Sequence, residues 1–422
     1  RRLELTPDFN ISEKAFLGTI LKENYLIEET TVTAEHLEDG RHKALFTVIK
    51  ELVKQGKPAD RVTLAMHPKI QAVGGLSYIN ELLSYADPSK FEEYEELVLD
   101  AWREKEKNRI LSQAKMENWD INKLMNELEK INLKKVDDYA PIRDLLIELH
   151  DAPWNEEYVQ QGATTGIKKL NDAINGFQPS ELTIIAARPS MGKTDVMLHF
   201  AKQVGWQGYI PVVFSLEMPA KKLAERLIAS TGRFNRMKLR NPKKYLTDEQ
   251  KRRWNETIGI VDKTNIQIFD QSGQSVPEMR AKIRQVMNKY KDKKLVVFID
   301  YLTLIRPQNY YNGNMHQQVT EISQSLKNMA KDFNIPVICL AQLNREVEKR
   351  ADKRPMMSDI RESGSVEQDA DNIIFLYRPK YYDKSIDDDT MELIVAKARN
   401  GATLTIEVRY NEATGEIRDE YY

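Results

Sequence analysis

Hydrophobic residues recur along the chain with two different spacings. As far as about Val136 they follow helical spacing, as Leu45, Ile49 and Leu52 do. From Thr165 onward, short apolar runs of strand length alternate with helical stretches. The change predicts an α-helical N-terminal domain, residues 1–136, followed by an α/β domain, residues 165–422, with a mostly parallel central sheet.

Three helices are expected in the N-terminal domain. Ser12 is predicted to cap the first, Thr33 to start the second, and a third helix should begin near Pro88. Gly56 is a stop signal for the second helix. The charge run at residues 103–107 indicates a solvated face of the third. Because no cluster of residues here suggests chemistry, we interpret this region as an assembly or docking domain.

Residues 137–164 differ in composition from both neighbours. A short amphipathic helix is expected from Ile142 to His150, between Pro141 and Pro153, and polar residues follow it. This pattern is typical of a linker. The helix either docks on a neighbouring molecule or packs on its own chain.

The second domain contains six apolar runs that we interpret as strands, followed by a hairpin. The runs are Leu182–Ala186, Pro211–Leu216, Leu295–Ile299, Pro336–Leu340, Ile373–Leu376 and Leu393–Ala396, and the hairpin is Leu404–Tyr410 with Gly415–Ile417.

A phosphate-binding loop is expected directly after the first of these strands. Its predicted nucleotide-binding residues are Arg188, Pro189, Ser190, Met191, Gly192, Lys193 and Thr194, and a helical stretch follows them. Gly-Lys-Thr closes the pattern G-x-x-x-x-G-K-[ST], although Ala187 stands where the pattern has its first glycine. In such a loop, backbone N–H groups cradle phosphates, the lysine binds the β- and γ-phosphates, and the Thr194 hydroxyl coordinates Mg²⁺. The motif predicts binding of ATP with Mg²⁺, and with the alternating strands and helices it predicts that residues 165–422 form a RecA-like P-loop ATPase domain.

Three other strands deliver polar residues to the same edge of a parallel sheet. Glu217, Asp300 and Gln342 each follow the end of one apolar run. Asp300 is expected to hold the Mg²⁺ shell, Glu217 to orient and deprotonate water, and Gln342 to sense the γ-phosphate. Alternatively, Glu217 is a helix-start carboxylate and Gln342 a loop amide that pairs with backbone.

Net charge, cysteine and histidine content limit the partners, metal sites and cellular compartment that are expected for the protein. The 422 residues carry a net charge of −1, which argues against a basic outer coat but not against a basic channel lining. Cys339, the one cysteine, lies in an apolar run and is expected to be a buried hydrophobe. The six histidines lack metal-ligand spacing. A single cysteine excludes an internal disulfide, so a reducing, cytoplasmic setting is expected. No apolar run is long enough for a membrane span.

With these residues in view, the chain resembles the DnaB-type replicative helicases over nearly its full length. The matching stretches are 185–194 (IAARPSMGKT), 214–218 (FSLEM), 299–302 (IDYL), 321–326 (EISQSL), 340–345 (LAQLNR), 358–371 (SDIRESGSVEQDAD) and 396–401 (AKARNG). The resemblance implies a homo-hexameric ring that encircles single-stranded DNA, hydrolyses ATP between subunits and moves 5′ to 3′. It also implies a primase and a helicase loader as partners, in a bacterial cell, with the gene either bacterial or phage-encoded.

The resemblance also gives roles to two basic residues near the end of the chain. By similarity, Lys397 and Arg399 reach across a subunit interface to the γ-phosphate of a neighbour. Supplied in trans, their charge would make hydrolysis depend on assembly. The alternative is that both are merely exposed basic residues at a strand end.

The stretch 361–365 looks like the loop that contacts DNA in this family. Arg361 is expected to pair with a phosphate, Glu362 to brace the loop, and Gly364 to let backbone N–H groups approach the strand. A surface turn without a DNA role is the alternative.

Two further segments have open interpretations. Tyr310 and Tyr311 either stack bases or pack on the fold. Residues 221–253, with twelve Lys or Arg against three Asp or Glu, either attract DNA or an acidic partner, or form solvated helices.

Two other functions compete with the helicase. A RecA-like recombinase would polymerise as a filament, and its images would differ from those of a ring. A nucleotide-gated scaffold for replication proteins would not need rapid, DNA-stimulated turnover.

Overall fold

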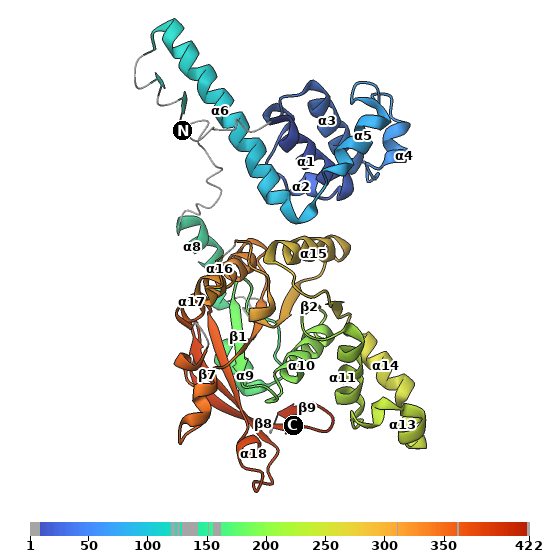
Figure 1. Ribbon diagram of the computed structural model, residues 1–422, viewed down its shortest axis with the longest axis vertical. Coiled ribbons are helices and arrows are strands. Elements are labelled where there is room, and N and C mark those ends of the chain that lie inside the picture. The colour runs from blue at the N-terminus through green and yellow to red at the C-terminus, as the bar shows by residue number, and fades with distance from the viewer. Residues whose placement is uncertain are drawn as a thin grey trace. The chain divides into compact units, whose positions relative to one another are not determined.

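The computed structural model describes residues 9–119, 123–124, 127–128, 142–150, 152–154, 162–309, 311–360 and 363–419. The chain divides into two compact units, residues 1–158 and 159–422. Figure 1 shows the first as helices and the second as a sheet with helices around it. No helix among the described residues is long and apolar enough to cross a bilayer.

The first unit is helical throughout its described part. Its elements are α1 (Phe9–Lys22), α2 (Leu26–Glu29), η1 (Ala34–His36), α3 (Gly40–Lys54), α4 (Arg61–Ala65), α5 (Gly75–Ser84), η2 (Pro88–Lys90), α6 (Phe91–Glu117), α8 (Ile142–His150) and η3 (Ala152–Trp154). The helices α1 through α6 share one apolar core, in which Phe16 is stacked between the rings of Phe46 and Phe91.

Two of the expected helix starts in this unit are wrong. Ser12 lies inside α1, which already begins at Phe9. Thr33 starts only the short 3₁₀ turn η1, and α3 begins at Gly40, where the Asp39 carboxylate accepts the backbone N–H of Arg41 at 2.8 Å. Both serine or threonine and aspartate can cap a helix, so composition alone did not separate the candidates. The third helix and the linker helix Ile142–His150 are confirmed.

The second unit is built around a nine-stranded sheet in the order β3-β2-β4-β5-β1-β6-β7-β8-β9. The strands are β1 (Leu182–Ala187), β2 (Ile210–Ser215), β3 (Gln267–Phe269), β4 (Leu295–Asp300), β5 (Val337–Gln342), β6 (Asn372–Tyr377), β7 (Thr390–Ala398), β8 (Leu404–Asn411) and β9 (Glu416–Asp419). β1 to β6 pair in parallel, and β6-β7-β8-β9 pair antiparallel. Every expected strand is present, whereas β3 was missed because it has only three half-buried residues.

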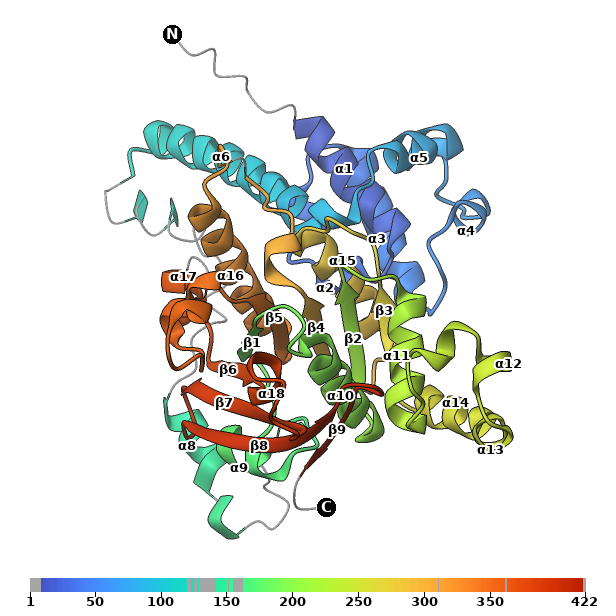
Figure 2. The same cartoon turned by 60° about the horizontal axis from the view of Figure 1, so that its bottom comes forward.

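Helices cover both faces of this sheet, as Figure 2 shows around β1 and β2. They are α9 (Lys168–Ile174), α10 (Lys193–Trp206), α11 (Ala220–Gly232), α12 (Pro242–Tyr245), α13 (Asp248–Arg252), α14 (Trp254–Asp262), α15 (Val276–Lys289), α16 (Met315–Asp332), α17 (Ser363–Asp369) and α18 (Pro379–Tyr382), with the 3₁₀ turns η4 (Lys238–Arg240), η5 (Leu302–Leu304), η6 (Arg345–Lys349) and η7 (Met357–Asp359).

Alternate residues of the parallel strands enter one of two apolar cores. In β1, Ile185 packs with α9 and α10, whereas Ile184 packs with α15 and α16. Because successive strand residues point to opposite faces, both faces of the parallel part of the sheet are buried, whereas β8 alternates buried and exposed residues. Parallel strands buried in this way carry their carboxyl ends to one common edge.

Candidate nucleotide site

The P-loop lies between β1 and α10, at the carboxyl edge of the parallel strands. Ser190 and Gly192 have positive φ angles of 64° and 103°. A Cβ on Gly192 would lie 3.2 Å from side-chain atoms of Met391 and Tyr410. Glycine therefore allows the loop to turn closely against β7 and β8, leaving the N–H groups at the start of α10 directed outward as an anion-binding site.

Ala187 stands at the pattern's first glycine because no turn occurs there. It is the last residue of β1 and pairs in register with Gln342 of β5. The side chain of Arg188 is occupied inside the domain, where it donates to the Leu343 carbonyl oxygen at 2.8 Å and pairs with Glu348 at 2.8 Å. Arg188 therefore anchors the loop to the segment after β5, and only its backbone faces the loop.

Lys193, Thr194 and Asp300 lie together at this edge. The Thr194 hydroxyl donates to Asp300 Oδ2 at 2.9 Å, and Lys193 Nζ donates to the Ala341 carbonyl oxygen at 3.2 Å. The ammonium of Lys193 also lies 5.1 Å from the ring centre of Tyr301. Sequence reasoning did not single out Tyr301, which directly follows Asp300.

Without a bound ligand, burial destabilises the charged forms of Lys193 and Asp300. Burial lowers the pKa of Lys193, although the nearby carboxylates of Asp300 and Glu217 act to raise it. Burial likewise raises the pKa of Asp300, although the Thr194 hydrogen bond and the charge of Lys193 act to lower it. A phosphate beside Lys193 and a cation beside Asp300 would both favour the charged forms. Hydroxyl and carboxylate oxygens are also the ligands that Mg²⁺ prefers, so these residues fit ATP with Mg²⁺.

Glu217 and Gln342 are delivered to the same edge by β2 and β5. Ser215, the last residue of β2, pairs in register with Asp300, and Glu217 follows two residues later with an exposed side chain. The start of α11 is capped by Asp270, which accepts the Ala220 N–H at 2.8 Å, rather than by Glu217. The alternative of a helix-start carboxylate is therefore not supported.

The other two candidates lie at the opposite edge of the sheet. β7 is antiparallel to β6, and Lys397 pairs in register with Ile373 near the start of β6. Arg399 donates its backbone N–H to the Asp371 carbonyl, and the Asp371 N–H donates to Leu182 at the start of β1. Arg399 is thus roughly 16 Å along the strand direction from the end of β1. Neither cation can reach the P-loop of its own chain.

Sequence reasoning missed a buried network directly beside the P-loop. The carboxylate of Asp195 accepts the Tyr410 hydroxyl at 2.7 Å and pairs with Arg226 at 3.2 Å and Arg236 at 2.5 Å. It ties the start of α10 to α11 and β8. Because its partners are 31, 41 and 215 residues away in sequence, spacing could not have revealed them.

The predicted DNA segment is described only in part. Arg361 and Glu362 lie outside the described residues. Gly364 belongs to the first turn of α17 rather than to a loop, and it is exposed, so that a Cβ at this position would meet no atom within 4 Å. The N–H groups of a first helical turn have no partner within the helix, so the backbone there still suits a phosphate contact.

The structure answers the question for Tyr311 and leaves both interpretations of residues 221–253 open. The Tyr311 hydroxyl donates to Glu321 Oε2 of α16 at 2.6 Å, so Tyr311 packs on the fold, while Tyr310 lies outside the described residues. Residues 221–253 form α11 to α13 and their turns, in which Lys238, Arg240 and Lys243 make no ion pair within the described chain.

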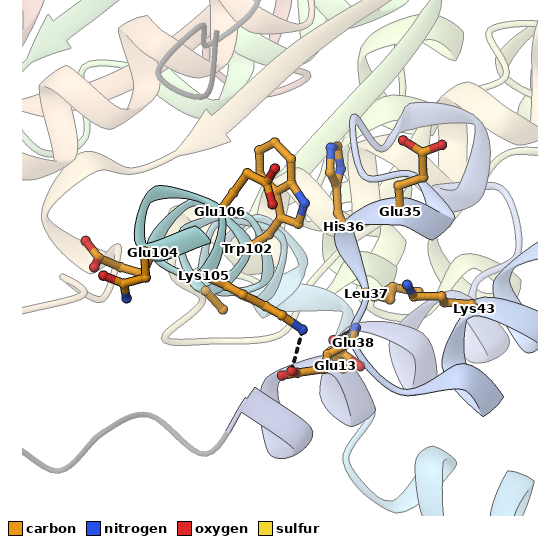
Figure 3. A pocket seen from close by; sticks show the side chains of 12 residues that line it. Glu13, Glu35, His36, Leu37, Glu38, Lys43, Trp102, Glu104, Lys105 and Glu106 are labelled. Carbon is orange, nitrogen blue, oxygen red and sulfur yellow. Dashed lines mark hydrogen bonds and ion pairs between the residues drawn. The ribbon is translucent and has the colours of Figure 1, made fainter. Parts of the chain in front are cut away.

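A hollow in the first unit offers different chemistry. Five of its twelve lining residues are glutamates, and Lys105 Nζ pairs across it with Glu38 at 2.6 Å (Figure 3). Carboxylates repel phosphates, so this hollow does not suit a nucleotide. No cluster of three or more metal-ligating side chains occurs in the described parts of either unit.

A doubly wound sheet with a P-loop after its central strand, and acidic residues at or just after the ends of β4 and β2, defines a RecA-like P-loop ATPase. Comparison with known proteins narrows the class. Residues 162–419 match the family described as DnaB-like helicase C terminal domain, and residues 7–100 match the DnaB-like helicase N terminal domain. The chain belongs to this family, and it is a replicative DNA helicase driven by its ATPase domain.

Three of the similar proteins match nearly the whole chain, and a fourth matches about two thirds of it. The replicative DNA helicase DnaB of Geobacillus stearothermophilus is 34% identical, over 96% of this chain and 93% of its own length. The replicative DNA helicase DnaC of Bacillus subtilis is 35% identical with the same coverage. A solved DnaB-like replicative helicase, described with its interactions with primase, is 33% identical with a TM-score of 0.63, covering 97% of this chain and 99% of that one. The ATPase domain of G40P is 37% identical, with a TM-score of 0.64 and coverage of 67% and 99%.

Proposed function

We propose that copies of this chain assemble head to tail into a homo-hexameric ring, in which each nucleotide site is completed by Lys397 and Arg399 of the partner subunit. The observation that carries the proposal is the placement of the P-loop and these two cations at opposite edges of one sheet. A chain with half a site on each edge completes a site only between two copies.

Within this arrangement, each residue at the carboxyl edge has a distinct task. Lys193 and the N–H groups of the P-loop bind the β- and γ-phosphates of ATP. Thr194 and Asp300 hold Mg²⁺, which when bound neutralises charge that develops on the phosphate oxygens. Glu217 orients a water molecule and accepts its proton at a carboxylate oxygen, and Gln342 reports whether the γ-phosphate is present.

The partner cations stabilise the charge that hydrolysis develops. A guanidinium presents several N–H donors in a plane, which suits the oxygens of a transferring phosphoryl group. Because these groups arrive from another copy, isolated chains should bind ATP yet hydrolyse it slowly.

DNA is expected at residues 361–364, where backbone and side-chain groups contact phosphates without reading sequence. The N-terminal unit is proposed to dock a primase and a loader. The solved structure of the similar DnaB-like helicase, described with its primase interactions, supports the first of these. The linker helix α8 is proposed to dock on a neighbouring subunit, because Ile142, Leu146 and Ile147 are each more than half exposed within one chain.

Forked DNA tests the function directly. With ATP and Mg²⁺ present, we expect strand separation that requires a 5′ tail as the loading strand. Unwinding of a substrate that has a 3′ tail and no 5′ tail would contradict the direction. Failure on every fork despite DNA-stimulated ATP hydrolysis would contradict the helicase and favour a filament-forming recombinase.

A further inference from the structure

Both candidate trans-acting cations are held by one short segment, residues 367–371. Lys397 Nζ donates to the carbonyl oxygens of Glu367 and Ala370, each at 2.6 Å. Arg399 pairs with Asp371 at 3.1 Å. The segment is the last turn of α17 and the two residues after it.

Asp371 divides its two carboxylate oxygens between different partners. Oδ2 accepts the Leu182 N–H at 2.8 Å and the ammonium of Lys327 at 2.6 Å. Oδ1 pairs with Arg399. The side chain is only 3% exposed, and Lys327 alone would compensate its buried charge. One oxygen therefore fixes the carboxylate to β1 and α16, and the other is left to hold Arg399.

Arg399 keeps unused donors in this arrangement. Its Nη1 pairs with Asp371, its Nη2 makes only a long contact of 3.4 Å to the Gln368 carbonyl, and the side chain is 52% exposed. A guanidinium has five N–H donors. The buried carboxylate can therefore set the direction of the group while its outer face remains available to a phosphate.

We propose that Asp371 is a positioning residue for Arg399, and that it holds the guanidinium outward at the sheet edge for the nucleotide of the partner subunit. The proposal rests on the proposed trans role of Arg399. It gives Asp371 a part in hydrolysis without contact to the nucleotide, because an arginine held in place loses less side-chain entropy when it engages a phosphate.

The same segment connects the cations to the segment that is proposed to bind DNA. α17 begins at Ser363, directly after Arg361 and Glu362, and it lies beside α16 (Figure 2). Seven helical residues span only about 10 Å. A shift of α17 on DNA binding would therefore move the carbonyl groups that hold Lys397 and the backbone that carries Asp371.

Asp371→Asn tests the positioning role in the assembled protein. An amide offers one acceptor oxygen, which the Leu182 N–H and Lys327 already occupy, so its NH₂ group would face Arg399. We expect the kcat of DNA-stimulated ATP hydrolysis to fall about tenfold while KM for ATP stays within about twofold. In an Arg399→Ala background, the same substitution should have no further effect on kcat.

Lys327→Met is the matched control, because it removes a partner of the other oxygen and leaves Arg399 paired. It should lower thermal stability as Asp371→Asn does, yet keep kcat near wild type. An equal loss of kcat in the control, or additive losses with Arg399→Ala, would overturn the positioning role. If Arg399→Ala itself leaves hydrolysis intact, the trans role fails. If Arg399→Ala lowers hydrolysis and Asp371→Asn does not, only the positioning role fails.

Discussion

Lys202 is a buried cation with no carboxylate within hydrogen-bonding distance among the described residues. On α10, its ammonium donates to the hydroxyl of Ser230 at 2.8 Å, and the residue is 5% exposed. Desolvation lowers its pKa from 10.5 to about 8. Hydroxyl groups satisfy its hydrogen bonds but do not balance its charge, so keeping it protonated costs stability.

Lys202→Met should therefore stabilise the second unit at neutral pH. The folded pKa is below the unfolded one, so the penalty is full below about pH 8 and disappears as pH rises towards 10.5. The shift corresponds to on the order of 3 kcal/mol. Urea unfolding at pH 7 and pH 10 measures this effect. The variant should have a larger free energy of unfolding than wild type at pH 7. Between pH 7 and pH 10, its free energy of unfolding should rise less than that of wild type. Loss of stability at pH 7 would mean that the Ser230 hydrogen bond outweighs the charge.

Individual site residues were predictable to different degrees. Glu217, Asp300 and Gln342 could be placed at one edge because each follows an apolar run, and parallel strands end together. Asp195 and Asp371 could not, since their partners come from distant parts of the chain and meet only in the folded domain. Strand ends are a local signal, whereas buried ion pairs are not.

At the scale of elements, the strands were easier to predict than the helix starts. Six buried runs gave six strands, because a strand buried on both faces must be apolar throughout. The short strand β3 lacks that pattern. Helix starts depend on single capping side chains, and the chain offers more candidates than helices, as Ser12 and Thr33 illustrate.

The carboxyl end of α17 depends on Lys397, which donates to the carbonyl groups of Glu367 in the last turn and of Ala370, the residue after the helix. Lys397→Met should leave the Glu367 and Ala370 oxygens without that donor and loosen the last turn of a helix already too short to be stable alone. Hydrogen exchange of a peptide covering residues 363–371 should become faster. Lys380→Met, which removes exposed pairs with Asp387 and Asp389, should leave this peptide unchanged. Equal exchange in wild type and Lys397→Met would show that the contacts do not hold the helix.

At the scale of the molecule, the site should be shared between subunits. Arg399→Ala and Glu217→Gln proteins should each hydrolyse ATP poorly, because every site in either assembly lacks one group. Mixed under conditions that exchange subunits, equal amounts should recover about a quarter of wild-type turnover, since a quarter of random interfaces join an intact Glu217 to an intact Arg399. Steady-state ATP hydrolysis measures the recovery. No recovery despite verified exchange would contradict action in trans.

The placement of the P-loop and the cations at opposite edges of the sheet also determines how many complete nucleotide sites an assembly contains. A closed ring of such chains contains as many complete sites as subunits, whereas an open row always has one fewer. In the proposed arrangement, an open ring that admits a strand of DNA would therefore have one incomplete site for as long as the gap lasts. Closing the gap would complete that site, so hydrolysis there would begin only once the strand is encircled.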